Sequence, residues 1–199
     1  MADRDYLPEL YGTPEWFQSL RWQRMWIGYM VGWWVGQFGL PTKVLDFGCG
    51  DGWWPKCFND LGSITGGIEL HQIATEYIPE CVHVMIHDLR KQTEFEGLYD
   101  LCICLEVAEH LNKQDGDVLC HSLVKHMSNT LLFSAAGPGQ EGTGHINLQP
   151  HAHWIERIER QGKVQFSPMK TTLVKSAFEN ITNELFAFLP RNLMVFCRI

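Results

Sequence analysis

The hydrophobic pattern after residue 42 consists of short apolar runs that alternate with stretches of helical or loop character. The apolar runs predict five strands, at Lys43–Phe47, Ser63–Ile68, Cys81–Ile86, Tyr99–Cys104 and Asn129–Ser134. Helical spacing lies between them, at Lys56–Leu61, Gln72–Tyr77, Gln114–Met127 and His153–Gln161. This alternation is typical of βαβ units, so the sequence predicts an α/β fold with a doubly wound, mostly parallel sheet.

The pattern is less regular toward the C-terminus. Apolar segments at Lys163–Phe166 and Leu193–Cys197 would bring the sheet to seven strands. Thr171–Phe178 predicts a further helix, whereas residues 183–189 fit a helix, a loop or a strand.

The segment before the first strand predicts a helical lid. Thr13 and Pro14 form a typical helix start, and the helix could continue to about residue 37. Gly28, Gly32 and Gly36 fall on one face of it. Because glycine lowers helix propensity, we expect this face to approach another element or a ligand closely, the alternative being a break near Gly32. We expect residues 1–40 to be a helical attachment and residues 41–199 to form one α/β domain.

Composition and charge narrow the function. The chain has 16 Lys and Arg residues against 23 Asp and Glu residues, a formal charge of −7, which disfavours a nucleic-acid partner. The seven cysteines lack CxxC spacing and predict reduced core thiols, and no signal-peptide pattern is present, so we expect a cytoplasmic protein. The apolar run from Met25 to Phe38 is too short for a membrane span.

The strongest local signal is the sequence Val44-Leu-Asp-Phe-Gly48-Cys-Gly50-Asp-Gly52. A strand that ends in an acidic residue and is followed by glycines is how doubly wound folds bind an adenosyl or dinucleotide group. This loop carries Asp51, Trp53 and Trp54 near the place where dinucleotide sites have a third glycine. This loop therefore suits a ligand without phosphate groups at this position better than it suits a dinucleotide.

Two further acidic residues follow the next two strands. Glu69 comes 19 residues after Gly50, where a carboxylate can accept hydrogen bonds from both ribose hydroxyls. Asp88 follows the third strand and could accept one from an adenine amine. Either could instead cap a helix or form a turn, but their occurrence in series favours an adenosyl site.

Together these motifs resemble those of class I S-adenosylmethionine-dependent methyltransferases over residues 40–165. The matching segments are Val44 to Gly52, Gly67-Ile-Glu69-Leu70, His87-Asp88-Leu89 and Tyr99 to Leu111. The resemblance implies a Rossmann-like seven-stranded fold and S-adenosylmethionine as cofactor. The cofactor residues that it implies are Asp46, Phe47, Gly48, Cys49, Gly50, Gly52, Trp53, Glu69, Leu70, Asp88, Leu89, Leu105 and Glu106.

Residues that would bind and activate the methyl acceptor are predicted after the fourth and fifth strands. Glu106, Glu109 and His110 have i, i+3, i+4 spacing, which would place them on one side of a helical turn and could hold Mg²⁺ or Mn²⁺. This pattern is similar to the metal motif of ubiquinone-biosynthesis O-methyltransferases and small-RNA 2′-O-methyltransferases. In many metal-free methyltransferases, however, the same Glu caps a helix and the His lines the cofactor pocket.

A glycine-rich stretch, residues 136–147, predicts a loop over the acceptor pocket. Its His145 is the candidate general base or an extra metal ligand, with Glu106 and His110 as the other candidate catalytic residues. Seven of the eight tryptophans lie in the first 54 residues, as candidates for the lid and wall of the pocket.

The sequence therefore predicts an S-adenosylmethionine-dependent enzyme, with O-methylation of a small molecule or glycan as the main hypothesis. No Asn/Asp-Pro-Pro-Tyr motif follows the fourth strand, which argues against methylation of DNA bases or protein glutamine. The alternatives are an RNA 2′-O-methyltransferase with a divalent metal and a non-catalytic S-adenosylmethionine-binding partner protein.

Overall fold

The computed structural model describes residues 11–94, 96–182 and 186–199. Its centre is a seven-stranded sheet of order β3-β2-β1-β4-β5-β7-β6. The strands are β1 Lys43–Phe47, β2 Ile64–Glu69, β3 His83–Ile86, β4 Tyr99–Leu105, β5 Met127–Ser134, β6 Val164–Phe166 and β7 Leu193–Arg198. β1 to β5 pair in parallel, and β7 pairs antiparallel with both β5 and β6. The predicted mostly parallel, seven-stranded sheet is confirmed.

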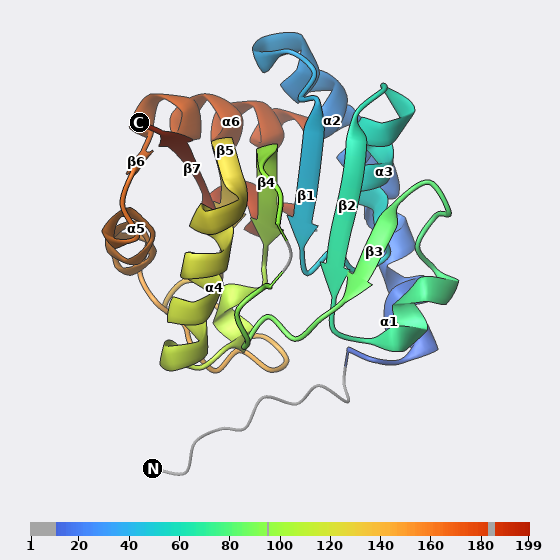
Figure 1. Cartoon of the computed structure of the whole chain (residues 1–199), viewed down its shortest axis with the longest axis horizontal. Helices are drawn as coiled ribbons and strands as arrows, with labels where there is room; N and C mark the ends of the chain where they lie inside the picture. The colour runs from blue at the N-terminus through green and yellow to red at the C-terminus, as the bar shows by residue number, and fades with distance from the viewer. Residues whose placement is uncertain (1–10, 95, 183–185) are drawn as a thin grey trace.

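Helices cover both faces of this sheet (Figure 1). The α-helices are α1 Pro14–Ser19, α2 Arg24–Phe38, α3 Trp53–Asp60, α4 Lys113–His126, α5 His151–Arg160, α6 Pro168–Ile181 and α7 Phe188–Asn192. Further 3-10 helices among the described residues are η2 Leu20–Gln23, η3 Gln72–Glu76 and η4 Ala108–His110. Residues 183–185, part of the stretch that the sequence left open, lie outside the described residues, and the helix α7 follows them.

An apolar core fills the space between the sheet and its helices on each face of the sheet. On one face α2, α3 and α6 pack through residues such as Met30, Phe58 and Phe178. On the other face α4 and α5 pack through residues such as Leu123 and Trp154. Side chains of successive strand residues point to opposite faces, which is why the buried strands carry apolar residues on both sides.

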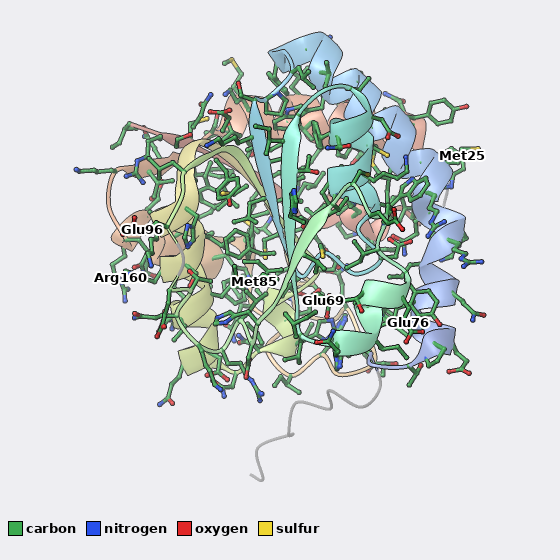
Figure 2. The ribbon with its side chains drawn as sticks, turned by 45° about the vertical axis from the view of Figure 1, so that its right-hand side comes forward. Met25, Glu69, Glu76, Met85, Glu96 and Arg160 are labelled. Atoms are coloured by element: carbon green, nitrogen blue, oxygen red, sulfur yellow. The ribbon has the colours of Figure 1, made fainter. Side chains whose placement is uncertain are left out.

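The N-terminal segment begins as predicted. The Thr13 hydroxyl accepts a hydrogen bond from the Trp16 amide at 3.2 Å, and Pro14 occupies the first turn. The helix is interrupted at η2, rather than running unbroken or breaking at Gly32. α2 then contributes to the core of the sheet, while Met25 on its outer side is 56% exposed (Figure 2).

The glycine face of α2 corrects another expectation. Gly28, Gly32 and Gly36 are exposed, and a Cβ atom built on any of them meets no atom within 4 Å. The expected close approach of another element is therefore wrong for the described residues. α2 packs with its opposite face, through Ile27, Met30, Val31 and Trp34. Among the described helices, none is long and apolar enough to cross a membrane.

Candidate active site

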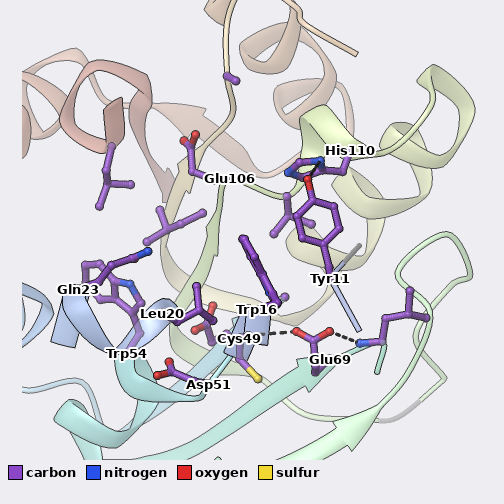
Figure 3. Close-up of a pocket in the computed structure, with 18 of the residues that line it drawn as sticks. Tyr11, Trp16, Leu20, Gln23, Cys49, Asp51, Trp54, Glu69, Glu106 and His110 are labelled. Atoms are coloured by element: carbon purple, nitrogen blue, oxygen red, sulfur yellow. Dashed lines mark hydrogen bonds between the residues drawn. The ribbon is translucent and has the colours of Figure 1, made fainter. Parts of the chain in front are cut away.

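A cavity of about 560 Å³ lies at the carboxyl ends of the central strands. The strand order reverses between β1 and β4, where the chain leaves the sheet in opposite directions and a crevice remains. Loops after β1, β2, β3, β4 and β5 all contribute to its lining, and α1, η2 and α2 add residues from the N-terminal segment. Figure 3 shows Glu106 on one side of this space and Glu69 on the opposite side.

The loop after β1 has a backbone that requires glycine. Gly48 adopts φ +77°, and a Cβ atom there would lie 2.6 Å from Cγ2 of Val107. The amides of Gly48 and Cys49 both donate to the carbonyl of Ile68, at 2.8 and 3.0 Å. The loop is therefore held against β2 and leaves its inner edge open to a ligand.

Glu69 fixes this loop from the end of β2. Its Oε2 accepts a hydrogen bond from the Gly50 amide at 3.1 Å, and its Oε1 accepts one from the Leu70 amide at 2.8 Å. Burial raises the pKa of Glu69, although these backbone hydrogen bonds oppose the shift. The carboxylate thus faces the cavity with an orientation set by the backbone.

Two more carboxylates belong to the end of β1 and to the loop that follows it. Asp46 is buried at the end of β1, and burial together with the carboxylates of Glu69 and Asp51 raises its pKa well above the usual value. Asp51 pairs with Arg24 Nε at 3.0 Å. Because like charges cluster here, a cationic ligand group would relieve their repulsion.

Asp88 has a partner that the sequence did not suggest. Its two carboxylate oxygens accept hydrogen bonds from Arg90, including Nε to Oδ1 at 2.9 Å and Nη2 to Oδ2 at 2.8 Å. Burial alone would raise the pKa of Asp88, but the hydrogen bonds and charge of Arg90 bring it below the usual value. The residue lines the cavity while it is engaged in this ion pair.

Most of the predicted cofactor residues line the cavity. These are Asp46, Gly48, Cys49, Gly50, Glu69, Leu70, Asp88, Leu89, Leu105 and Glu106. Three others lie outside the lining. Phe47 is fully buried in the core, Gly52 is the residue before α3, and Trp53 packs its ring against the Arg24 guanidinium. The neighbouring Trp54 lines the cavity instead, as does Trp16, whereas Trp26, Trp33 and Trp34 pack in the core.

Glu106 is held in a conformation that is unusual for its residue type. It adopts φ +55°, and its amide donates to the carbonyl and to the hydroxyl of Ser134, both at 3.1 Å. Its carboxylate accepts hydrogen bonds from Asn192 Nδ2 at 3.1 and 3.2 Å. Left-handed backbone at a non-glycine residue costs about 1–3 kcal/mol and is frequent at functional sites. Glu106 precedes the turn of η4, so it does not lie on the expected helical turn.

Glu109 ties the loop after β5 to the site. Its Oε1 accepts a hydrogen bond from the Ala136 amide at 3.1 Å, and its carbonyl accepts from the Ile146 and Asn147 amides. The side chain is fully buried, and its Oε2 has no hydrogen-bond partner among the described residues. Burial and the neighbouring Glu106 carboxylate raise the pKa of Glu109 well above its usual value.

His110 and His145 are both oriented by backbone carbonyl groups. Nδ1 of His110 is 3.1 Å from the Gly144 carbonyl, and Nδ1 of His145 is 3.0 Å from the Gln140 carbonyl. These contacts assign the proton to Nδ1 in each ring and leave Nε2 as a lone-pair donor. Burial lowers the pKa of His110 to about 4, so this imidazole is neutral at pH 7.

Among the described residues, one group of side chains that could hold a metal ion lies beside the cavity, with His110 and His145 in its lining and Glu109 buried behind them. Ligand atoms of Glu109, His110 and His145 lie within 4.8 Å of one another. The sequence had combined Glu106 with Glu109 and His110 and had offered His145 as an extra ligand, whereas the fold groups His145 with Glu109 and His110 and leaves Glu106 out. The separation of 35 residues between His110 and His145 in the sequence explains why local spacing could not show this grouping.

Several residues of the site had no signal in the sequence. Tyr11 donates a hydrogen bond from its hydroxyl to the Thr143 carbonyl and lies 3.4 Å from Nδ1 of His110. Burial and the Glu109 carboxyl raise the pKa of Tyr11 to about 12. Gln23 lines the cavity from η2, and Asn192 holds Glu106 across 86 residues of sequence. No motif links these residues, since only the fold brings them together.

Comparisons with known proteins agree with this geometry. A family model described as methyltransferase domain matches residues 33–134, just over half of the chain. No curated protein matches the sequence.

Solved structures share the fold at low identity. A TehB-like S-adenosylmethionine-dependent methyltransferase from Corynebacterium glutamicum superposes with a TM-score of 0.67 at 15% identity, covering 96% of this chain and 99% of that one. Magnesium protoporphyrin IX methyltransferase from Synechocystis, with bound S-adenosylhomocysteine, gives 0.63 at 19% identity over 89% and 84%. The plantazolicin methyltransferase BpumL, in complex with a monoazolic desmethylPZN analogue and S-adenosylhomocysteine, gives a TM-score of 0.64 at 12% identity, covering 96% of this chain and 88% of that one. The chain therefore belongs to the methyltransferase domain family and has the fold of class I S-adenosylmethionine-dependent methyltransferases.

Proposed function

We propose that this methyltransferase methylates a hydroxyl group of a small molecule or glycan. The observation that carries the proposal is the pairing of two sets of groups across one cavity. On one side, Asp46 and Glu69 lie at the ends of β1 and β2, and Asp88 follows β3. Carboxylate and imidazole groups that can handle a proton, those of Glu106 and His145, face the same space. Donor and acceptor could thus bind side by side, as an in-line displacement requires.

The first set suits the charge and shape of S-adenosylmethionine. This cofactor carries an ammonium and a sulfonium group, and the carboxylate cluster under the glycine loop favours cations. Glu69 would accept hydrogen bonds from the ribose hydroxyls. Asp88 would receive the adenine amine beside its ion pair with Arg90.

The second set suits proton transfer from a hydroxyl. When bound, S-adenosylmethionine would supply a methyl group on a sulfonium: the acceptor oxygen would bond to the methyl carbon from the side opposite the sulfur, and the C–S bond would break to release S-adenosylhomocysteine. Nε2 of His145 would accept the hydroxyl proton, because Nδ1 is engaged by the Gln140 carbonyl. Glu106, oriented by Asn192, would hold the hydroxyl in line.

The residues present also fit a divalent metal. The unpartnered Oε2 of Glu109 and the two free Nε2 atoms would hold it, and the backbone contacts of the imidazoles are typical outer-shell partners. A metal there would lower the pKa of a coordinated hydroxyl. Two imidazoles and one carboxylate favour Mn²⁺ or another transition metal over Mg²⁺, which prefers oxygen ligands.

A binding and transfer experiment tests the proposal. Calorimetry with S-adenosylmethionine should show binding, and H145A should keep that affinity while losing methyl transfer to a hydroxyl acceptor. Metal content would be measured on the purified protein and on E109Q, alongside transfer with and without added Mn²⁺. The absence of S-adenosylmethionine binding would instead support a non-catalytic role, and transfer only to an RNA 2′-hydroxyl would replace the acceptor class.

A further inference from the structure

One side of the cavity is apolar and is not used by the groups assigned above. It is formed by Leu20, Ile27, Phe186, Phe188 and Leu189. Ile27, Phe186 and Leu189 are only 4%, 2% and 2% exposed. These residues come from the two ends of the chain, η2 and α2 on the one hand and the segment leading into α7 on the other. We call this surface the apolar wall.

The aromatic rings of the apolar wall are fixed by one another. Phe186 and Phe188 meet edge to face, with ring centroids 5.3 Å apart and planes at 82°. Trp22, which is 45% exposed, contacts Phe186 in the same manner, with centroids 5.5 Å apart. Such contacts define ring orientation, so the wall presents a preformed surface rather than a loose apolar patch.

The apolar wall is connected to the reacting groups through α7. Phe188 begins this helix, and Asn192 at its end donates both hydrogen bonds to the Glu106 carboxylate. Glu106 therefore lies at the border of the wall. In Figure 3, Leu20 and Gln23 lie on the side of the cavity away from His110 and Tyr11.

The charge of the lining restricts what can bind beside this wall. Among the described residues, the lining contains no lysine or arginine, while Asp46, Asp51, Glu69, Asp88 and Glu106 all contribute carboxyl groups. Arg24 and Arg90, outside the lining, already pair with Asp51 and Asp88, so an acceptor with a phosphate or carboxylate group would meet the other carboxyl groups without a lysine or arginine of the lining to compensate its charge. Nor do the five residues of the wall offer a polar side chain: of the polar lining residues, Gln23 comes from the same element as Leu20, and Glu106 is held by Asn192 at the end of α7.

We propose that the apolar wall is the acceptor subsite and that it selects a small uncharged aromatic molecule with one reactive hydroxyl, a phenol, over a sugar or an anionic acceptor. The inference rests on the proposed function, since it names the acceptor class for that hydroxyl transfer. A flat ring buries its faces against Ile27, Phe188 and Leu189, and its hydroxyl reaches Glu106 at the border. A sugar would leave hydroxyl groups unpaired against the same surface, which is unfavourable.

The test separates acceptor binding from cofactor binding. The full chain, saturated with S-adenosylhomocysteine, would be titrated calorimetrically with neutral phenols (phenol, catechol, 2-naphthol), neutral sugars (glucose, methyl glucoside) and anions (4-hydroxybenzoate, glucose 6-phosphate). We expect binding by members of the phenol set only, and labelled methyl transfer from S-adenosylmethionine to the same members.

F188A should weaken phenol binding about tenfold or more while the affinity for S-adenosylmethionine stays unchanged. F188L, which keeps an apolar side chain, should recover most of the loss. Leu173→Ala, at an exposed position on α6, is the matched control and should alter neither affinity.

Each outcome has a distinct meaning. Failure of S-adenosylmethionine to bind would overturn the proposed function itself. Intact cofactor binding without binding of any phenol would overturn only the acceptor subsite. Equal or better transfer to a sugar or an anion, or an F188A variant with unchanged phenol affinity, would do the same.

Discussion

The exposed glycine face of α2 gives a prediction whose sign depends on backbone geometry alone. Gly28, Gly32 and Gly36 lie within a regular helix, and a Cβ atom at each would meet nothing within 4 Å. Alanine in an exposed helix interior is more stable than glycine by about 1 kcal/mol. Gly36 lies in the last turn, where the gain is smaller, so the triple G28A/G32A/G36A variant should gain about 2 kcal/mol in unfolding free energy.

Urea unfolding followed by tryptophan fluorescence measures this gain. The midpoint should rise with an unchanged slope, and the melting temperature should rise by about 4–8 °C, at about 2–4 °C per kcal/mol for a chain of this size. Affinity for S-adenosylmethionine should not change, because these positions lie outside the cavity lining.

Gly39 provides a matched control on the same helix. Its Cβ position is equally open, but its backbone adopts φ +83° and ψ 166°, a region used almost only by glycine. G39A should therefore lose about 1–3 kcal/mol, although it adds the same methyl group to the same open surroundings. A triple variant with unchanged or lower stability would refute the reasoning, and would mean that the glycine face is covered by another surface.

Two further predictions concern the glycine loop and a buried histidine. G48A should weaken S-adenosylmethionine binding at least about tenfold in calorimetry, because its Cβ atom would lie 2.6 Å from Val107 and its backbone would keep a positive φ. Adding V107A removes the steric clash but not the backbone strain, so the double variant should recover only part of the affinity. Full affinity in G48A alone would contradict the role given to this glycine. Burial lowers the pKa of His126, whose ring contacts Thr93 and the Gly97 carbonyl. As the pH falls through 6.5, the ordinary pKa of histidine, this residue therefore becomes protonated in the unfolded chain at a higher pH than in the folded chain. The free energy of unfolding should thus fall as the pH drops below 6.5. In H126Q the urea midpoint should change less between pH 7.5 and 5.5 than it does in the unmodified protein. The same change of midpoint with pH in both proteins would contradict this.

The glycine loop and its acidic residues illustrate what spacing along the chain can predict. Parallel strands end at the same edge of a sheet, so Asp46, Glu69 and Asp88 had to converge once the strands were identified. The structure adds how they are held, by the Gly50 and Leu70 amides and by Arg90. The hydrogen bond from Leu70 to Glu69 is local, whereas the one from Gly50 joins residues 19 apart, and a helix-capping acid would show the same residue type in the sequence.

The glycine face of α2 shows where spacing misleads. Glycines four residues apart share a face whether that face is buried or exposed, and the burial is decided by the apolar residues on the opposite side. The sequence there has large apolar residues on both faces, with Met25 and Tyr29 on one and Met30 and Trp34 on the other, so periodicity did not identify the packed face. The tertiary structure assigned Met30 and Trp34 to the core and Met25 and Tyr29 to the surface.

By itself, the sequence determined the parallel sheet, the glycine loop and the order of the acidic residues, because strand periodicity and strand-end position are local properties repeated along the chain. Only the tertiary structure decided which distant residues share the acceptor side. His145 reaches Glu109 and His110, Asn192 reaches Glu106, and Phe188 reaches the side of Leu20, through contacts that no local pattern encodes. The physical reason is that packing of whole elements, not spacing within one, brings these side chains to the same cavity.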